Sequence, residues 1–184
     1  FFNADSMGDD ASPGQTYRMA SLFAEGQTMT GAHALEHSMQ RYHWRSPVWL
    51  LFIRRAFLDE ARMTFYPGII HEDELYTGTL FARCPRCAAL HRTLVRHRIR
   101  GGSTMGTRFG LRNLTCYAIA CRGLMEERHH ATTRLATYTI NNVLLTAKKM
   151  TLADKMRGIS ILHSTGVLRL ARTKILIKFL LSRA

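Results

Sequence analysis

The second half of the chain repeats apolar residues at helical spacing almost without interruption from Met105 onward. The pattern breaks near residues 127–133, 150–152 and 165–166, which divides it into separate helices. The longest charge-free stretches, such as 135–147, contain Thr and Asn and fall well below the ~18 apolar residues that a membrane-spanning helix needs. We therefore expect a helical C-terminal bundle and no transmembrane helix.

The first half of the chain combines short helices with strands. Residues 1–30 are polar and glycine-rich, and their weak periodicity predicts only loops or an edge strand. Capping residues and helical spacing predict helices over 31–42, 47–58 and 72–83, and a run containing Thr and Val predicts a strand over 90–97. The expected fold class is α+β and mostly helical, with a short strand pair. We expect two regions, 1–105 and a basic helical region 106–184.

Positive charge is concentrated in the second half of the chain. The formal net charge is +13, with −4 over residues 1–80 and +17 over residues 81–184. Such a field attracts nucleic acid, anionic lipid surfaces or phosphorylated small molecules. A basic helical nucleic-acid-binding module is therefore an alternative function. The chain contains no helix-turn-helix, RNP-like or complete zinc-finger pattern, which makes nucleic acid the less favoured partner.

Four cysteines accompany nine methionines in a sequence without an export signal. This usage is typical of a reducing interior, so we expect a cytoplasmic protein. Cys84 and Cys87 have the spacing of a zinc-ligand pair, and Cys116 with Cys121 could supply a second pair. The second spacing, in an expected helix, is poor for a zinc ribbon. We therefore predict free structural cysteines and no metal site in this chain.

Three motifs between Trp49 and Met105 carry a family resemblance. They are Arg54-Arg55-Ala56-Phe57-Leu58, Tyr66-Pro67-Gly68-Ile69-Ile70-His71-Glu72-Asp73-Glu74-Leu75 and His97-Arg98-Ile99-Arg100-Gly101-Gly102-Ser103. In order and spacing they resemble the second half of the family 2 glycosyltransferases of bacterial surface-polysaccharide synthesis. His97 stands where a tyrosine is commoner in that family.

The resemblance implies an inverting sugar transfer on a GT-A scaffold, of which this chain would be the acceptor-side portion. Asp73 would be the general base, because the attacking hydroxyl must lose its proton as the new bond forms. The resemblance assigns the donor diphosphate to Arg98, Arg100 and Ser103. It assigns the acceptor site to Trp49, His71, Glu72 and Tyr76.

Each of these assignments has an alternative in ordinary folding chemistry. The carboxylates of residues 72–74 could simply be favourable charges at a helix N-terminus. Trp49 and Tyr76 could be core aromatics, which is the commoner use of aromatic residues at helical spacing.

The nucleotide-binding half of such an enzyme has no counterpart in this sequence. The family's metal-holding Asp-x-Asp is absent, and Asp5, Asp9 and Asp10 have different surroundings. We expect the complete enzyme to use Mg²⁺ or Mn²⁺ with ligands outside this chain. Its partners would be a nucleotide sugar and a glycan or lipid-linked acceptor. We expect no sugar transfer by the chain alone.

Residues 166–182 are predicted to form an amphipathic C-terminal helix. Leu168, Ile175 and Phe179 make one apolar stripe, and Leu170, Ile177 and Leu181 make another, with basic residues between them. Such a helix can bring a protein to an anionic membrane surface or to a second copy of itself. The alternative is a helix packed on both sides within a bundle. The first possibility predicts a peripheral protein at the inner face of the cell membrane.

Overall fold

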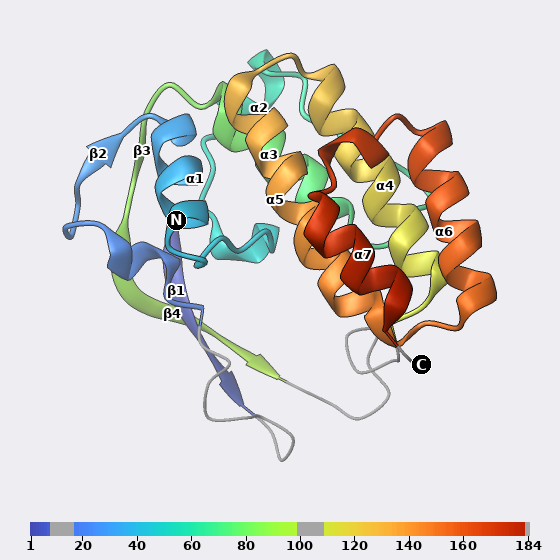
Figure 1. The fold of residues 1–184 in the computed structure, drawn as a ribbon. Coiled ribbons are helices and arrows are strands. Elements are labelled where there is room, and N and C mark those ends of the chain that lie inside the picture. Colours follow the sequence, from blue (N-terminus) through green and yellow to red (C-terminus); the bar gives the residue numbers. More distant parts are fainter. Residues whose placement is uncertain (8–16, 99–108, 183–184) are drawn as a thin grey trace. The chain divides into compact units, whose positions relative to one another are not determined.

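A parallel pair of strands organises the N-terminal part of the chain. β1 (Phe2–Met7) pairs with β4 (Leu90–Arg98), from Phe2 opposite Leu90 to Met7 opposite Arg98, with an irregularity around Asn3 (Figure 1). The structure, a computed structural model, describes residues 1–7, 17–98 and 109–182. The sequence predicted only loops or an edge strand in residues 1–30, whereas β1 lies there and Phe1, Phe2 and Ala4 are buried core residues.

The chain divides into two compact units. Unit 1 comprises residues 1–63 and 80–108, and unit 2 comprises residues 64–79 and 109–184. Helix α3 (Glu72–Arg83) contributes its first part to unit 2 and its last turn to unit 1. The described elements confirm an α+β protein that is mostly helical. No helix within the described ranges is long and apolar enough to cross a membrane.

Short elements complete unit 1. They are η1 (Met19–Leu22), β2 (Thr28–Met29), α1 (Gly31–Gln40), η2 (Val48–Leu50), α2 (Arg55–Glu60) and β3 (Cys87–Ala88). β2 and β3 pair in antiparallel fashion. α1 begins as predicted, because the Thr30 hydroxyl accepts a hydrogen bond from the His33 amide. A side chain at Gly31 would collide with the Phe81 carbonyl, which explains the glycine at the start of α1.

The single helix predicted over 47–58 is wrong. η2 ends at Leu50, the chain then runs extended through Leu51, and α2 begins only at Arg55. The physical reason is tertiary packing, since the Phe52 ring lies 4.9 Å from the Phe2 ring, between centroids. An extended segment keeps this contact with β1, and it overrides the local helical pattern.

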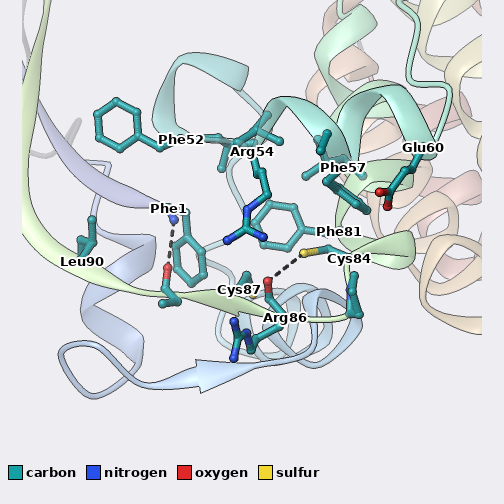
Figure 2. A pocket seen from close by; sticks show the side chains of 16 residues that line it. Phe1, Phe52, Arg54, Phe57, Glu60, Phe81, Cys84, Arg86, Cys87 and Leu90 are labelled. Carbon is teal, nitrogen blue, oxygen red and sulfur yellow. Dashed lines mark hydrogen bonds between the residues drawn. The ribbon is translucent and has the colours of Figure 1, made fainter.

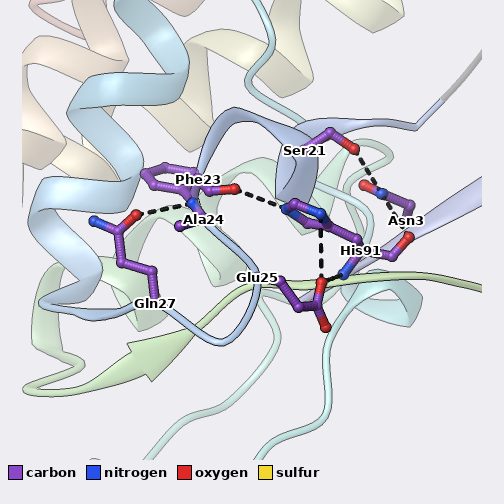
Figure 3. Close-up of polar contacts among 7 residues, drawn as sticks. All are labelled: Asn3, Ser21, Phe23, Ala24, Glu25, Gln27 and His91. Atoms are coloured by element: carbon purple, nitrogen blue, oxygen red, sulfur yellow. Dashed lines mark hydrogen bonds and ion pairs between the residues drawn. The ribbon is translucent and has the colours of Figure 1, made fainter.

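Polar side chains fasten the loop after η1 to the start of β4 (Figure 3). The His91 ring donates from Nε2 to the Phe23 carbonyl over 2.7 Å, and its Nδ1 lies 3.4 Å from Glu25 Oε2. Asn3 on β1 donates to the Ser21 hydroxyl and to the His91 carbonyl. These bonds satisfy the buried Asn3 amide nitrogen where the strand pair begins.

Unit 2 is a helical bundle that confirms the predicted breaks. It contains α4 (Leu111–Glu126), α5 (His130–Thr146), η4 (Ala147–Lys149), α6 (Leu152–Ser164), η5 (Leu168–Leu170) and α7 (Thr173–Leu181) (Figure 1, yellow to red). Fully buried side chains include Leu114, Leu124, Leu135, Ile140, Leu144, Leu162 and Phe179. Gly78 of α3 packs against Leu124 and Leu135, whose terminal methyl groups would have to shift to admit a side chain there.

The prediction that a continuous C-terminal helix begins at residue 166 is wrong, because α7 begins later. Gly166 takes a left-handed conformation, with φ at +71°, and α7 begins only at Thr173. The buried Asn141 side chain explains the interruption. It donates to the Leu170 carbonyl and accepts from the Arg172 amide, which holds the residues before α7 in a non-helical path.

Candidate functional site

The start of α3 holds three adjacent carboxylates. The chain reaches it through two left-handed residues, Gly68 with φ at +80° and His71 with φ at +65°. Residues other than glycine seldom adopt this conformation, although histidine does so more often than most, and the contacts of the His71 ring described below hold it there. Asp73 lies in the first turn of a helix, as predicted, together with Glu72 and Glu74. Asp73 is half-buried, whereas Glu74 is buried.

Glu74 is anchored inside unit 2. Its carboxylate accepts a hydrogen bond from the Thr139 hydroxyl of α5, and only 7% of Glu74 is exposed. Burial raises the pKa of Tyr117 and the pKa of Cys121, and the nearby Glu74 carboxylate raises both further. Glu74 therefore fixes the first turn of α3 to the bundle.

His71 is held by two residues of α4. Its ring stacks on Tyr117, with centroids 4.2 Å apart and planes 13° apart. The Asn113 amide nitrogen lies 3.0 Å from His71 Nε2, and Asn113 Oδ1 accepts a bond from the Gly110 amide. This second bond orients the Asn113 amide, so its NH₂ group donates to Nε2. The His71 proton is then on Nδ1.

The environment keeps His71 neutral. Burial lowers the pKa of His71, and the Glu72 carboxylate opposes that shift only in part. Because its imidazole is neutral, His71 does not offset the negative charge of Glu72 and Asp73. This run of three carboxylates, in which Glu72 and Asp73 are partly exposed, can accept a proton from a bound hydroxyl.

Tyr76 lies one turn further along α3. It is 7% exposed, and the Phe65 ring covers one of its faces at a centroid distance of 4.1 Å and an angle of 8°. Burial raises the pKa of Tyr76. The residues His71, Glu72, Asp73 and Tyr76, predicted from the resemblance, thus share one local structure in unit 2.

The remaining predicted site residues belong to other parts of the chain. Trp49 lies in unit 1, where its ring stacks on His97 at 5.2 Å and meets the Tyr17 ring edge-on at 4.9 Å. Arg98 is exposed at the end of β4. Arg100 and Ser103 lie outside the described residues.

Asn113, Tyr117 and Thr139 complete the carboxylate turn but were not found by sequence reasoning. Asn113 and Tyr117 lie more than forty positions from His71 in the sequence, and Thr139 lies 65 positions from Glu74. The sequence pattern that could have indicated Asn113 and Tyr117 is their four-residue spacing, which puts both on one face of a helix. That signal does not point to His71 as the partner.

Two cysteines line a pocket of about 560 Å³ in unit 1 (Figure 2). Cys84 follows the end of α3, and Cys87 lies in β3. All four cysteines are free thiols. Within the described ranges, no three His, Cys, Asp or Glu side chains gather into a potential metal site. Asp5 is instead ion-paired with Arg18.

Comparison of the chain with protein-family models, with curated proteins and with solved structures found no match.

Proposed function

We propose that this chain is the acceptor-side part of an inverting, nucleotide-sugar-dependent glycosyltransferase of surface-polysaccharide synthesis, with a GT-A-like fold in the complete enzyme. The observation that carries the proposal is the position of Asp73. This carboxylate is partly exposed in the first turn of α3, between the anchored Glu74 and the neutral His71. The motif resemblance around Asp73 supplies the reaction class.

In the proposed reaction Asp73 acts as the general base. An acceptor hydroxyl attacks the anomeric carbon of the donor sugar, and its proton passes to the Asp73 carboxylate as the new bond forms. The nucleoside diphosphate leaves from the opposite face. The Thr139–Glu74 bond and the Asn113–His71 bond support the geometry of the turn, because they fix the residue after Asp73 and the residue two positions before it.

The donor side of the proposal rests on the end of β4. Arg98 is exposed there, and the chain continues to Arg100 and Ser103 outside the described residues. Paired arginines bind diphosphates and neutralise the charge that develops on a leaving nucleotide. The divalent ion of such an enzyme would assist the same departure. We assign it no ligand in this chain.

The strand pair supports a larger sheet in the complete enzyme. Parallel strands usually occur in sheets of several strands that are covered on both faces. Among the described strands, β4 pairs with β1 alone. A nucleotide-binding half would provide further strands, and the isolated chain is proposed to be inactive.

A membrane-facing surface of unit 2 completes the proposal, since lipid-linked acceptors are held at membranes. On α7, Ile177 and Leu181 are 50% and 78% exposed, and Lys174 and Lys178 are exposed beside them. On α6, Leu152 and Met156 are also largely exposed. Apolar side chains with flanking cations fit an anionic lipid surface.

The test uses a fusion protein in which this chain is joined to a nucleotide-binding half. We expect Asp73→Asn to lower kcat for sugar transfer by about 10²–10⁴-fold with little change in donor affinity. Arg100→Ala should mainly weaken donor binding. Asp59→Asn is the matched control, because Asp59 is exposed on α2 and pairs with Arg55. Unchanged turnover in Asp73→Asn would show that the assignment is wrong.

A further inference from the structure

Cys84 follows the end of α3, Cys87 lies in β3, and both line one pocket of unit 1. The Cys84 amide donates to the Phe81 carbonyl at the end of α3, and the Cys84 carbonyl accepts from the Gly31 amide over 2.9 Å. Cys87 is paired with Met29 through the β2–β3 ladder. Pro85 and Arg86 form the short connection. Both backbones are therefore fixed, and the side chains remain half-buried at the pocket.

The pocket surrounding the two thiols is basic. Arg54 and Arg86 line it, and Glu60 is the one acid among its described lining residues. Figure 2 shows both arginines together with Cys84 and Cys87 around the pocket. Cations around a pocket attract ligands that carry carboxylates. The rest of the lining is mainly apolar, including Phe1, Phe57 and Phe81.

The two thiols have unequal acidity. In its thiol form Cys84 Sγ donates to the Arg86 carbonyl over 3.3 Å. As a thiolate it accepts a hydrogen bond from the Cys87 thiol, which lowers the pKa of Cys84 to about 6. The same bond, with burial, raises the pKa of Cys87. The lower pKa of Cys84 favours it as the attacking thiolate, whereas the raised pKa of Cys87 favours its thiol form.

We propose that Cys84 and Cys87 form a redox-active dithiol that exchanges with anionic low-molecular-weight disulfides. The proposal does not depend on the glycosyltransferase assignment. It rests on the shared pocket, the two-residue spacing and the cations around the thiols. The cysteines of α4 provide a contrast, because Cys116 and Cys121 are buried and burial raises the pKa of Cys121.

The exchange proceeds in two balanced steps. The Cys84 thiolate attacks one sulfur of the small disulfide, which forms a mixed disulfide and expels one small thiolate. Cys87 then loses its proton to solvent and attacks Cys84 Sγ, which expels the second small thiolate. The protein dithiol is oxidised by two electrons, and one small disulfide is reduced to two thiols.

Glutathione disulfide is a suitable probe for the test, because each half carries carboxylates. The reduced full chain is treated with it, alkylated and digested with trypsin. Cleavage after Arg83 and after Arg86 separates the cysteines, so an internal disulfide appears as two covalently joined peptides. We expect this pair to form while Cys116 and Cys121 remain thiols.

Variants separate the roles of the two cysteines. Cys87→Ser should stop at a stable mixed disulfide on Cys84, and Cys84→Ser should leave Cys87 a thiol. Cys116→Ser, the matched control, should oxidise like the unmutated chain. Arg54→Gln should slow the reaction with glutathione disulfide but not with uncharged hydroxyethyl disulfide.

The pH dependence gives a second readout. Alkylation of Cys84 should rise with a midpoint near pH 6, and the midpoint should shift toward 9.0 in Cys87→Ala, which removes the hydrogen-bond donor. The facing charged groups are Arg54 and Glu60 from α2 and its cap, Arg86 from the connection, and the amino group of Phe1, whose charge lowers the pKa of Cys84. A mixed disulfide without internal closure in the unmutated chain would overturn the proposal, as would equal reactivity of Cys84 and Cys116.

Discussion

Thr139 of α5 donates a hydrogen bond to the Glu74 carboxylate of α3, and both residues are buried. Thr139→Val keeps the shape of the side chain but leaves the carboxylate without this donor. We expect the free energy of unfolding to fall by about 1–3 kcal/mol, the cost of removing a partner from a buried polar group. Urea unfolding followed by circular dichroism measures it. Thr133→Val, at an exposed position of the same helix, should change stability little.

If both variants lost the same stability, the Glu74–Thr139 bond would have no special role. In the joined enzyme, Thr139→Val should also lower kcat, because the first turn of α3 carries Asp73. Restored function in Thr139→Ser, which keeps the hydroxyl, would assign the effect to the hydrogen bond.

His71 should titrate below the ordinary histidine value of 6.5, because burial disfavours its charged form. Histidine proton shifts followed by NMR against pH measure this midpoint. Asn113→Ala removes the donor to Nε2 of the neutral ring, so the midpoint should rise toward 6.5. Asn142→Ala, at an exposed asparagine of α5, is the control and should leave the midpoint unchanged.

The sign of the linked stability follows from the lowered pKa. The folded chain binds fewer protons at His71 than the unfolded chain does, so protonation favours unfolding. The contribution of the neutral His71 to the free energy of unfolding is fully present above pH 6.5. It declines as the pH falls below 6.5 toward the pKa of His71 in the folded chain. His71→Gln should therefore lose less stability on acidification than the unmutated chain. An equal loss in both proteins would contradict the assignment.

Local patterns predicted the elements whose signals are local. The helix over 72–83, the strand at 90–97 and the breaks of the helical half were confirmed, because caps, glycines and periodicity reside in the segments themselves. β1 was not identified, since its strand pairing depends on β4, nearly ninety residues away. The helix over 47–58 failed for a similar reason, because Phe52 packs against Phe2.

The candidate site shows the same division. Asp73 at a helix start could be predicted from the glycine turn and the run of carboxylates. The partners that orient its neighbours could not, because Asn113 and Thr139 reach α3 only through bundle packing. Cys84 and Cys87 were found by their spacing, but their basic surroundings come partly from Arg54 on a distant segment.

Lys155 of α6 is 1% exposed and fastens the end of α7. Its Nζ donates to the Ser182 carbonyl and to the Ser182 hydroxyl, the latter over 3.0 Å, and it lies 5.7 Å from the centre of the Phe179 ring. Lys155→Met keeps the aliphatic volume and removes the bonds. We expect a loss of about 1.5–3 kcal/mol in unfolding free energy, as for hydrogen bonds of a charged group. Lys174→Met, at an exposed position of α7, should have little effect.

A Lys155→Met variant as stable as the unmutated chain would mean that burying the charge costs as much as its bonds contribute. Hydrogen exchange identifies that case, because the α7 amides of Lys155→Met should still exchange faster than those of the unmutated chain once Ser182 has lost its bonds to Lys155.

The exposed face of α7 predicts binding to anionic membranes. Deleting residues 166–184 would also remove the buried Val167 and Phe179 and the Ser182 partner of Lys155, so surface substitutions are the cleaner test. Lys174→Gln with Lys178→Gln should weaken sedimentation with anionic phospholipid vesicles about tenfold or more, at about 1 kcal/mol per cation near the headgroups. Arg112→Gln, an exposed cation on α4, is the control.

The apolar contribution is tested separately, because Ile177 and Leu181 would enter the lipid interface. Ile177→Ser with Leu181→Ser should weaken vesicle binding even at high salt, where the lysine contribution is screened over a Debye length of about 3 Å at 1 M. Light scattering without vesicles tests whether a second copy of the chain, and not a membrane, covers this face. If the serine variants converted a dimer to a monomer and left vesicle binding intact, a second copy of the chain would cover α7, and the membrane assignment would be wrong.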